Sequence, residues 1–122
     1  MFIFVYGTLK KGYLNHYLLV DAELIGKAKT IEKYSMYPSV CNNYPFAIES
    51  KKENFLDGEI YKIDKTIEKK LDILEGYPDL YIKKEIDVVL EKGEELKAII
   101  YFKNEDTYIS SADTSVKSLI SW

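Results

Sequence analysis

The chain has 122 residues, of which 47% are hydrophobic and 30% charged, and its formal net charge at pH 7 is −3. This composition excludes a disordered chain and predicts one folded domain over residues 1–122. The acidic balance gives no electrostatic footprint for nucleic acid, although eleven tyrosines make stacking on single-stranded bases harder to exclude. No apolar run is long enough for a membrane span or a signal peptide.

The first apolar stretch, Phe2–Val5, predicts a short strand buried on both faces. It leads into a turn, residues 6–12, bounded by Gly7 and Gly12, and then into Leu14–Leu19, where apolar residues recur at helical spacing. A strand, a glycine turn and a helix in this order direct backbone N–H groups at one point, which suits a small anion or a carbonyl group. A tight connection without any ligand fits the same pattern.

The next segment, Leu24–Tyr34, alternates loosely and predicts a strand with a bend at Gly26. Tyr37 and Tyr44 each precede a proline, so we expect extended backbone there, as in an edge strand and a loop. Phe46–Ile48 then predicts another short strand.

A strand is predicted over Gly58–Ile63, and Asp64 is a natural N-cap for a helix that runs to about Glu75. Gly76 and Pro78 end this helix. One apolar stripe faces the core, and four charged residues are expected to face water; the stripe is Ile67, Leu71 and Leu74, and the charged residues are Lys65, Glu68, Lys69 and Asp72.

From Tyr81 to Val88 the chain alternates again, and a turn at Lys92-Gly93 leads into Leu96–Phe102, which predicts a hairpin. A short closing helix is expected in the tail from Asp113, where Val116, Leu119 and Ile120 recur at helical spacing. Strands that mostly do not alternate with helices predict an α+β fold: a small closed or strongly curved mixed β-barrel with two or three short helices.

Candidate chemical groups are few. The single histidine, His16, has no cysteine or histidine cluster near it, so we predict no metal site. The single cysteine, Cys41, excludes an internal disulfide and suits a reducing cytoplasm; nothing local supports its pairing with His16, and a bystander thiol is the simpler interpretation. No phosphate-binding or dinucleotide-binding motif is present, and we expect no cofactor.

Glu75 stands at the very end of an amphipathic helix. The negative end of the helix dipole disfavours its charge, and burial in an apolar pocket would raise its pKa toward the range of a general base at neutral pH. A solvated surface glutamate before a glycine cap fits the same position.

Four blocks of the sequence resemble, in order and spacing, the gamma-glutamylcyclotransferase-like family, which includes gamma-glutamylamine cyclotransferases and AIG2-like proteins. They cover roughly residues 1–103 and are Val5-Tyr6-Gly7-Thr8-Leu9-Lys10 with Gly12 and Asn15; Tyr37-Pro38 with Tyr44-Pro45; Gly58-Glu59-Ile60-Tyr61-Lys62-Ile63-Asp64; and Leu71-Asp72-Ile73-Leu74-Glu75-Gly76-Tyr77-Pro78 with Leu80-Tyr81.

The resemblance implies a compact α+β fold with a small β-barrel and a pocket at one end. It implies a loop that holds a gamma-glutamyl group through backbone amides, formed by Tyr6, Gly7, Thr8 and Leu9. Glu75 falls on the family's catalytic glutamate, and the reaction would release 5-oxoproline and an amine without metal or organic cofactor. Tyr81 and Tyr101 either line the pocket or belong to ordinary packing. We expect a gamma-glutamyl small molecule as partner, no nucleic acid or membrane, and a monomer or weak homodimer.

Two departures from the family pattern concern the pocket. Lys83 stands where the family often has arginine, and lysine keeps the charge but lacks the bidentate fork of arginine. Ser111–Thr114 with Trp122 replaces a Gly-Asp-Trp found near the C-terminus of many relatives. Two other interpretations stay open: a non-catalytic module that binds an anionic metabolite with the Tyr6–Leu9 loop, and a structural domain that binds a partner through surface tyrosines.

Overall fold

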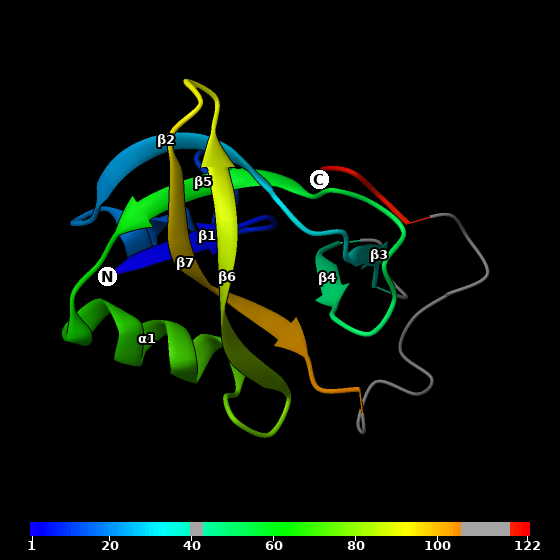
Figure 1. Ribbon diagram of the computed structural model, residues 1–122. Coiled ribbons are helices and arrows are strands. Elements are labelled where there is room, and N and C mark those ends of the chain that lie inside the picture. Colours follow the sequence, from blue (N-terminus) through cyan, green and yellow to red (C-terminus); the bar gives the residue numbers. More distant parts are fainter. Residues whose placement is uncertain (40–42, 106–117) are drawn as a thin grey trace.

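The computed structural model describes residues 1–39, 43–105 and 118–122 (Figure 1). Five strands form a closed barrel in the order β1-β5-β2-β6-β7, and two more form a separate sheet. The barrel strands are β1 (Phe2–Val5), β2 (Glu23–Thr30), β5 (Asp57–Lys62), β6 (Tyr81–Leu90) and β7 (Glu95–Lys103). The separate sheet pairs β3 (Ser35–Pro38) with β4 (Pro45–Ile48), and the helix α1 spans Lys65–Glu75. The predicted closed mixed barrel is confirmed.

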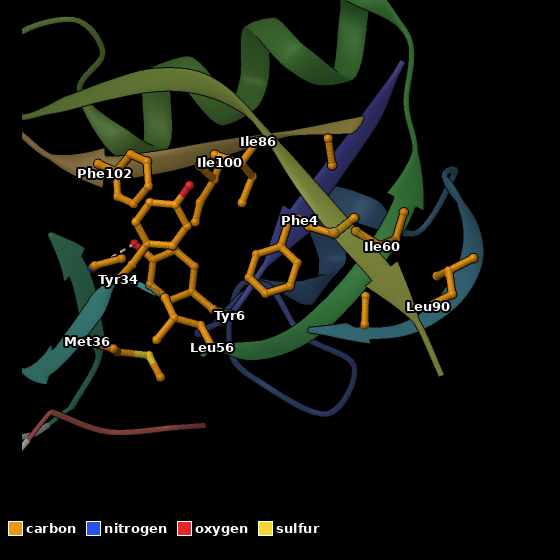
Figure 2. Packing of buried hydrophobic residues seen from close by; sticks show 14 residues of the cluster. Phe4, Tyr6, Tyr34, Met36, Leu56, Ile60, Ile86, Leu90, Ile100 and Phe102 are labelled. Carbon is orange, nitrogen blue, oxygen red and sulfur yellow. Dashed lines mark hydrogen bonds between the residues drawn. The ribbon is translucent and has the colours of Figure 1, made fainter. Parts of the chain in front are cut away.

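The first strand closes the barrel, because it pairs antiparallel with β5 on one side and parallel with β7, through Ile3 and Ile99, on the other. Its residues alternate between two buried clusters. Phe4 packs among the side chains that fill the barrel (Figure 2), whereas Ile3 and Val5 pack in the layer that includes Leu71 of α1. This two-sided burial explains why the strand is apolar at every position.

The helix begins and ends where the sequence predicts. The Asp64 side chain accepts a hydrogen bond of 2.8 Å from the backbone N–H of Ile67, and Gly76 takes the left-handed conformation at the C-terminal end. Ile67 and Leu71 are buried, whereas Leu74 remains 39% exposed. Among the residues that the structure describes, no helix is long and apolar enough to cross a membrane.

The expectation that Glu68 and Asp72 face water is wrong. Both carboxylates form ion pairs of 3.0 Å with Lys83 on β6, and the three side chains are less than a quarter exposed. The helical period separates α1 into faces, but it does not tell which faces a neighbouring strand covers.

The helix predicted after Gly12 shrinks to one 3₁₀ turn, η1 (His16–Leu19). Asn15 does not cap it with its side chain, because that side chain donates to the Thr8 hydroxyl at 2.9 Å, and the Asn15 backbone N–H donates to the Thr8 carbonyl at 2.9 Å. These bonds hold the segment against the preceding loop rather than in a longer helix.

The second strand ends at Thr30 rather than at Tyr34, and its predicted bend at Gly26 is a register shift in the pairing with β5. The predicted short strand at Phe46–Ile48 lies within β4, whose partner β3 starts one residue after Tyr34.

The prediction of a short closing helix is wrong for residues 118–122, which the structure describes. Asp113 and Val116 lie outside the described residues, as does Cys41. Leu119 donates its backbone N–H to the Met36 carbonyl at 2.7 Å, and the Ile120 carbonyl accepts from Asp57 at 2.8 Å. Residues 118–122 therefore form no helix, and the backbone bonds of Leu119 and Ile120 reach β3 and β5.

The cap at Asp64 gives a test of this local analysis. Asp64→Ala removes the acceptor of the Ile67 N–H and should lower the free energy of unfolding by about 1 kcal/mol. Asp64→Ser keeps a side-chain acceptor and should stay within a few tenths of a kcal/mol of the wild type. Urea denaturation at pH 7 measures both; equal midpoints for Asp64→Ala and the wild type would contradict the assignment of the cap.

Candidate active site

A cavity of about 390 Å³ opens at the end of the barrel where β1 finishes. The loop after β1, the start of β4, the end of α1, the start of β6 and the end of β7 all contribute to its wall. All the site residues predicted from the sequence line it: Tyr6, Gly7, Thr8, Leu9, Glu75 and Tyr81.

The loop after β1 presents its backbone to this cavity. Lys10 donates its backbone N–H to the Gly7 carbonyl at 3.0 Å, which closes a tight turn. A Cβ atom on Gly7 would lie 2.9 Å from the ring of Pro45, so glycine allows β4 to approach the loop. The N–H groups of Thr8 and Leu9 donate no hydrogen bond to any residue that the structure describes. They remain able to bind a carboxylate or an oxyanion.

The single histidine supports the loop from behind. His16 Nδ1 lies 3.0 Å from the Leu9 carbonyl oxygen, and its ring centroid lies 5.7 Å from that of Tyr61. Across residues 1–39, 43–105 and 118–122, no group of three or more His, Cys, Asp or Glu side chains is arranged to hold a metal ion. The role of His16 in this arrangement is structural.

The carboxyl group of Glu75 faces the cavity from the last residue of α1. Burial raises its pKa to about 7, and the positive charge of Lys103 opposes this rise. No hydrogen bond or ion pair joins it to another described residue. At neutral pH the group therefore exchanges between its charged and neutral forms, as a general acid or base must.

Three tyrosines surround Glu75. Burial raises the pKa of Tyr6, Tyr81 and Tyr101, and the negative charge of Glu75 adds to each rise. The Tyr6 hydroxyl donates to the Tyr101 carbonyl at 2.8 Å, and the Tyr101 hydroxyl donates to Asp72 at 2.6 Å. In contrast, the Tyr81 hydroxyl has no hydrogen-bond partner within the described part of the chain, so it can donate to a bound molecule.

Lys83, at a position where the family pattern often has arginine, forms two ion pairs. The Lys83 ammonium contacts Glu68 and Asp72, each at 3.0 Å, and lies 4.3 Å from the centroid of the Tyr77 ring. Because Asp72 also accepts the hydrogen bond from Tyr101, the ammonium group holds in place a wall residue of the cavity.

Sequence reasoning missed several residues that line the cavity. They are Leu14, Asn15, Asn43, Tyr44, Pro45, Leu74, Leu80 and Lys103, besides Phe4 and Val5. A signal for one of them existed: counting outward from the predicted Lys92-Gly93 turn places Lys103 opposite Tyr81, the pairing that the structure shows. The others come from β1, the segment before η1, the start of β4 with the two residues before it, the end of α1 and the segment after it, and the pattern of each segment alone does not show that it borders a cavity.

The structure also contains a second cavity, of about 460 Å³, between β2, β5 and the end of β6. Its charged side chains are mixed in sign, and two of them, Lys29 and Asp57, pair with each other at 3.3 Å. It contains none of the predicted site residues, and Glu75 is not part of its wall.

Comparison with known proteins identifies the family of this chain. The family profile described as "Gamma-glutamyl cyclotransferase, AIG2-like" matches residues 3–118. A Methanocaldococcus jannaschii protein, provisionally named a gamma-glutamylcyclotransferase, is 41% identical over 105 residues, covering 85% of each chain. Gamma-glutamylaminecyclotransferase B of Danio rerio is 33% identical over 136 residues, covering 94% of this chain and 71% of the relative. The chain belongs to the gamma-glutamyl cyclotransferase, AIG2-like family.

The fold of this family member agrees with a solved structure. An AIG2-like protein of Mus musculus superposes with a TM-score of 0.80 over 99% of this chain and 86% of the other, at 24% sequence identity. The resemblance predicted from the four sequence blocks is therefore confirmed. The names of the family and of the two relatives support activity of the gamma-glutamyl cyclotransferase type.

The ion pairs of Lys83 give a stability test. Lys83→Met removes the ammonium group shared by the partly buried carboxylates of Glu68 and Asp72 and leaves Glu68 only the longer contact of 3.9 Å with the exposed Lys65. This should lower the free energy of unfolding by about 1–3 kcal/mol. The control is Lys97→Met, which removes an exposed pair of 2.8 Å with Asp87 and should cost less than about 1 kcal/mol. Urea denaturation measures both, and equal losses would contradict the burial argument.

The raised pKa of Glu75 predicts how stability depends on pH. Because the folded chain holds the proton up to about pH 7, stability present below the unfolded pKa of about 4.5 is lost as the pH rises through 7. Glu75→Gln removes this titration, so the variant should gain on the order of 2 kcal/mol over the wild type between pH 5 and pH 8.

Urea denaturation across this pH range measures the difference. The matched control is Glu95→Gln, which makes the same substitution at an exposed position at the start of β7. A Glu75→Gln difference that is flat with pH would show that the folded chain does not disfavour the Glu75 charge.

Proposed function

We propose that this chain is a gamma-glutamyl cyclotransferase that cleaves a gamma-glutamyl amine or peptide. The α-amino nitrogen of the substrate attacks its own γ-carbonyl carbon, the amide bond breaks, and the products are 5-oxoproline and a free amine. One observation carries the proposal: the Glu75 carboxyl, with a pKa of about 7, shares a cavity with the N–H groups of Thr8 and Leu9, which donate to none of the residues that the structure describes.

Glu75 moves the protons in this reaction. The substrate's α-ammonium must lose a proton before its nitrogen can attack, and a carboxylate whose pKa lies near the working pH is a suitable base. A second proton leaves that nitrogen when the ring closes. Glu75 delivers both protons in turn to the leaving nitrogen, so the amine departs as an ammonium ion and the carboxylate is regenerated.

The remaining catalytic contribution is positioning and charge stabilisation. A cavity that folds the substrate so that its amine meets its carbonyl supplies a proximity effect of up to about 7 kcal/mol. The N–H groups of Thr8 and Leu9 can bind the oxyanion that develops on the γ-carbonyl oxygen or the substrate's α-carboxylate. The Tyr81 hydroxyl is available as a further donor. The names of the relatives from M. jannaschii and D. rerio support this reaction class.

The role of Glu75 is tested by Glu75→Gln. The variant cannot accept a proton, so its kcat should fall by about 10²–10⁴-fold, while its far-UV circular dichroism matches that of the wild type. The assay measures 5-oxoproline release from gamma-glutamyl-lysine, gamma-glutamyl amides, gamma-glutamyl amino acids and glutathione.

Glu95→Gln serves as the control and should retain full turnover. Wild-type turnover in Glu75→Gln would overturn the proposed base. If the folded wild-type protein releases no 5-oxoproline from any substrate of the panel, the catalytic proposal is overturned. The loop would then be interpreted as a metabolite-binding site without catalytic activity.

A further inference from the structure

Lys103, at the end of β7, places a positive charge in the candidate active site. It lines the cavity beside Tyr81, and its ammonium nitrogen lies 5.2 Å from the centroid of the Tyr81 ring. In the described part of the chain no carboxylate lies within ion-pair distance of it, and it is the only lysine or arginine in the cavity wall. It acts electrostatically on Glu75, whose pKa it lowers. Lys103 is therefore a cation held in the same cavity as the proposed general base, without an ion-pair partner in the described part of the chain.

The cavity wall also carries large apolar side chains that remain exposed to solvent. Leu14 is 84% exposed, Leu80 51%, Tyr44 41% and Leu74 39%. Covering such surface with an apolar group removes it from water, which stabilises a complex. They come from four separate segments, so an apolar group at this place would contact several of them at once.

The chemistry of the substrate decides which part meets these residues. The γ-carbonyl and the α-amino group must lie at Glu75 and the Tyr6–Leu9 loop, where the proposed reaction occurs. In a gamma-glutamyl amino acid, the carboxylate of the leaving residue is only two bonds from the leaving nitrogen. A cation close to the general base is therefore within reach of that carboxylate, and the adjoining side chain extends toward the exposed apolar residues.

We propose that the leaving group of the substrate is an apolar α-amino acid, with its carboxylate bound by Lys103 and its side chain against Leu14 and Leu80. This inference rests on the proposed function and deepens it. The interaction of Lys103 with the face of Tyr81 holds the ammonium in position before the substrate arrives. A leaving amine without a carboxylate leaves this cation unpaired, and a leaving group with a net positive charge is repelled by it.

Two substrates that differ only in one carboxylate test the role of Lys103. Gamma-glutamyl-leucine and gamma-glutamyl-isoamylamine share the γ-glutamyl part and the branched side chain. The wild type should favour gamma-glutamyl-leucine in kcat/KM by about 10–100-fold, the range of a charge-assisted hydrogen bond. Lys103→Met should remove this preference by lowering kcat/KM for gamma-glutamyl-leucine alone. Lys103→Arg should keep most of the preference.

The comparison uses the plateau of a pH profile from pH 6 to pH 9, because removal of Lys103 raises the pKa of Glu75 and would shift the profile for both substrates. Lys62→Met, an exposed lysine at the far end of β5, is the control and should leave the preference unchanged. Equal loss on both substrates would overturn the proposal, since Lys103 would then bind the γ-glutamyl part.

A second pair of substrates tests the apolar contacts. Leu14→Asn and Leu80→Asn should each reduce the preference for gamma-glutamyl-leucine over gamma-glutamyl-alanine by about threefold or more. An unchanged preference in both variants would overturn the placement of the side chain. If the wild type releases no 5-oxoproline from any substrate, the proposed function itself is overturned. This result is distinct from an active enzyme whose variants keep the substrate preference or lose kcat/KM equally on both substrates.

Discussion

The Tyr6 hydroxyl joins three parts of the chain, and the geometry of the cavity depends on this contact. It donates to the Tyr101 carbonyl on β7 at 2.8 Å and accepts from the Ala47 N–H on β4 at 3.1 Å. Because both roles of the hydroxyl are satisfied, its burial carries no unpaired polar group. Tyr6 directly follows the strand that closes the barrel, so these bonds fix the start of the loop against the two elements that face it.

Hydrogen bonds of the neighbouring tyrosines to other groups leave the Glu75 carboxyl available to a substrate. The hydroxyl groups of Tyr6 and Tyr101 are engaged elsewhere, so these tyrosines exclude water from the carboxyl without donating a hydrogen bond to it. A donated bond would stabilise the charged form and lower the pKa. Burial raises the pKa of Glu75 and the charge of Lys103 lowers it, and the resulting pKa is about 7. Packing and the charge of Lys103 thus tune the pKa of a group that the helix merely presents.

Local chemistry predicted the parts of the fold that local chemistry controls. The helix α1 has its own cap at Asp64 and its own stop at Gly76, and the β6–β7 hairpin has its own turn at Gly93. The segment after Gly12 also shows helical spacing, but bonds from Asn15 to Thr8 outweigh the weak helical tendency of so short a stretch. The ion pairs of Glu68 and Asp72 could not be predicted from the helix, because their partner Lys83 belongs to the strand that follows it.

By itself the sequence determined the family, the bounds of α1 and the turn of the β6–β7 hairpin, because motif order, caps and hydrophobic period are properties of neighbouring residues. The family resemblance, rather than any local pattern, associated the Tyr6–Leu9 loop with Glu75. Only the tertiary structure decided which side chains surround Glu75. Leu14, Tyr44 and Lys103 reach the cavity from segments far apart in the chain, and the closed barrel brings them together. Desolvation, which moves the pKa of Glu75 to about 7, is likewise a property of that packing and not of any residue alone.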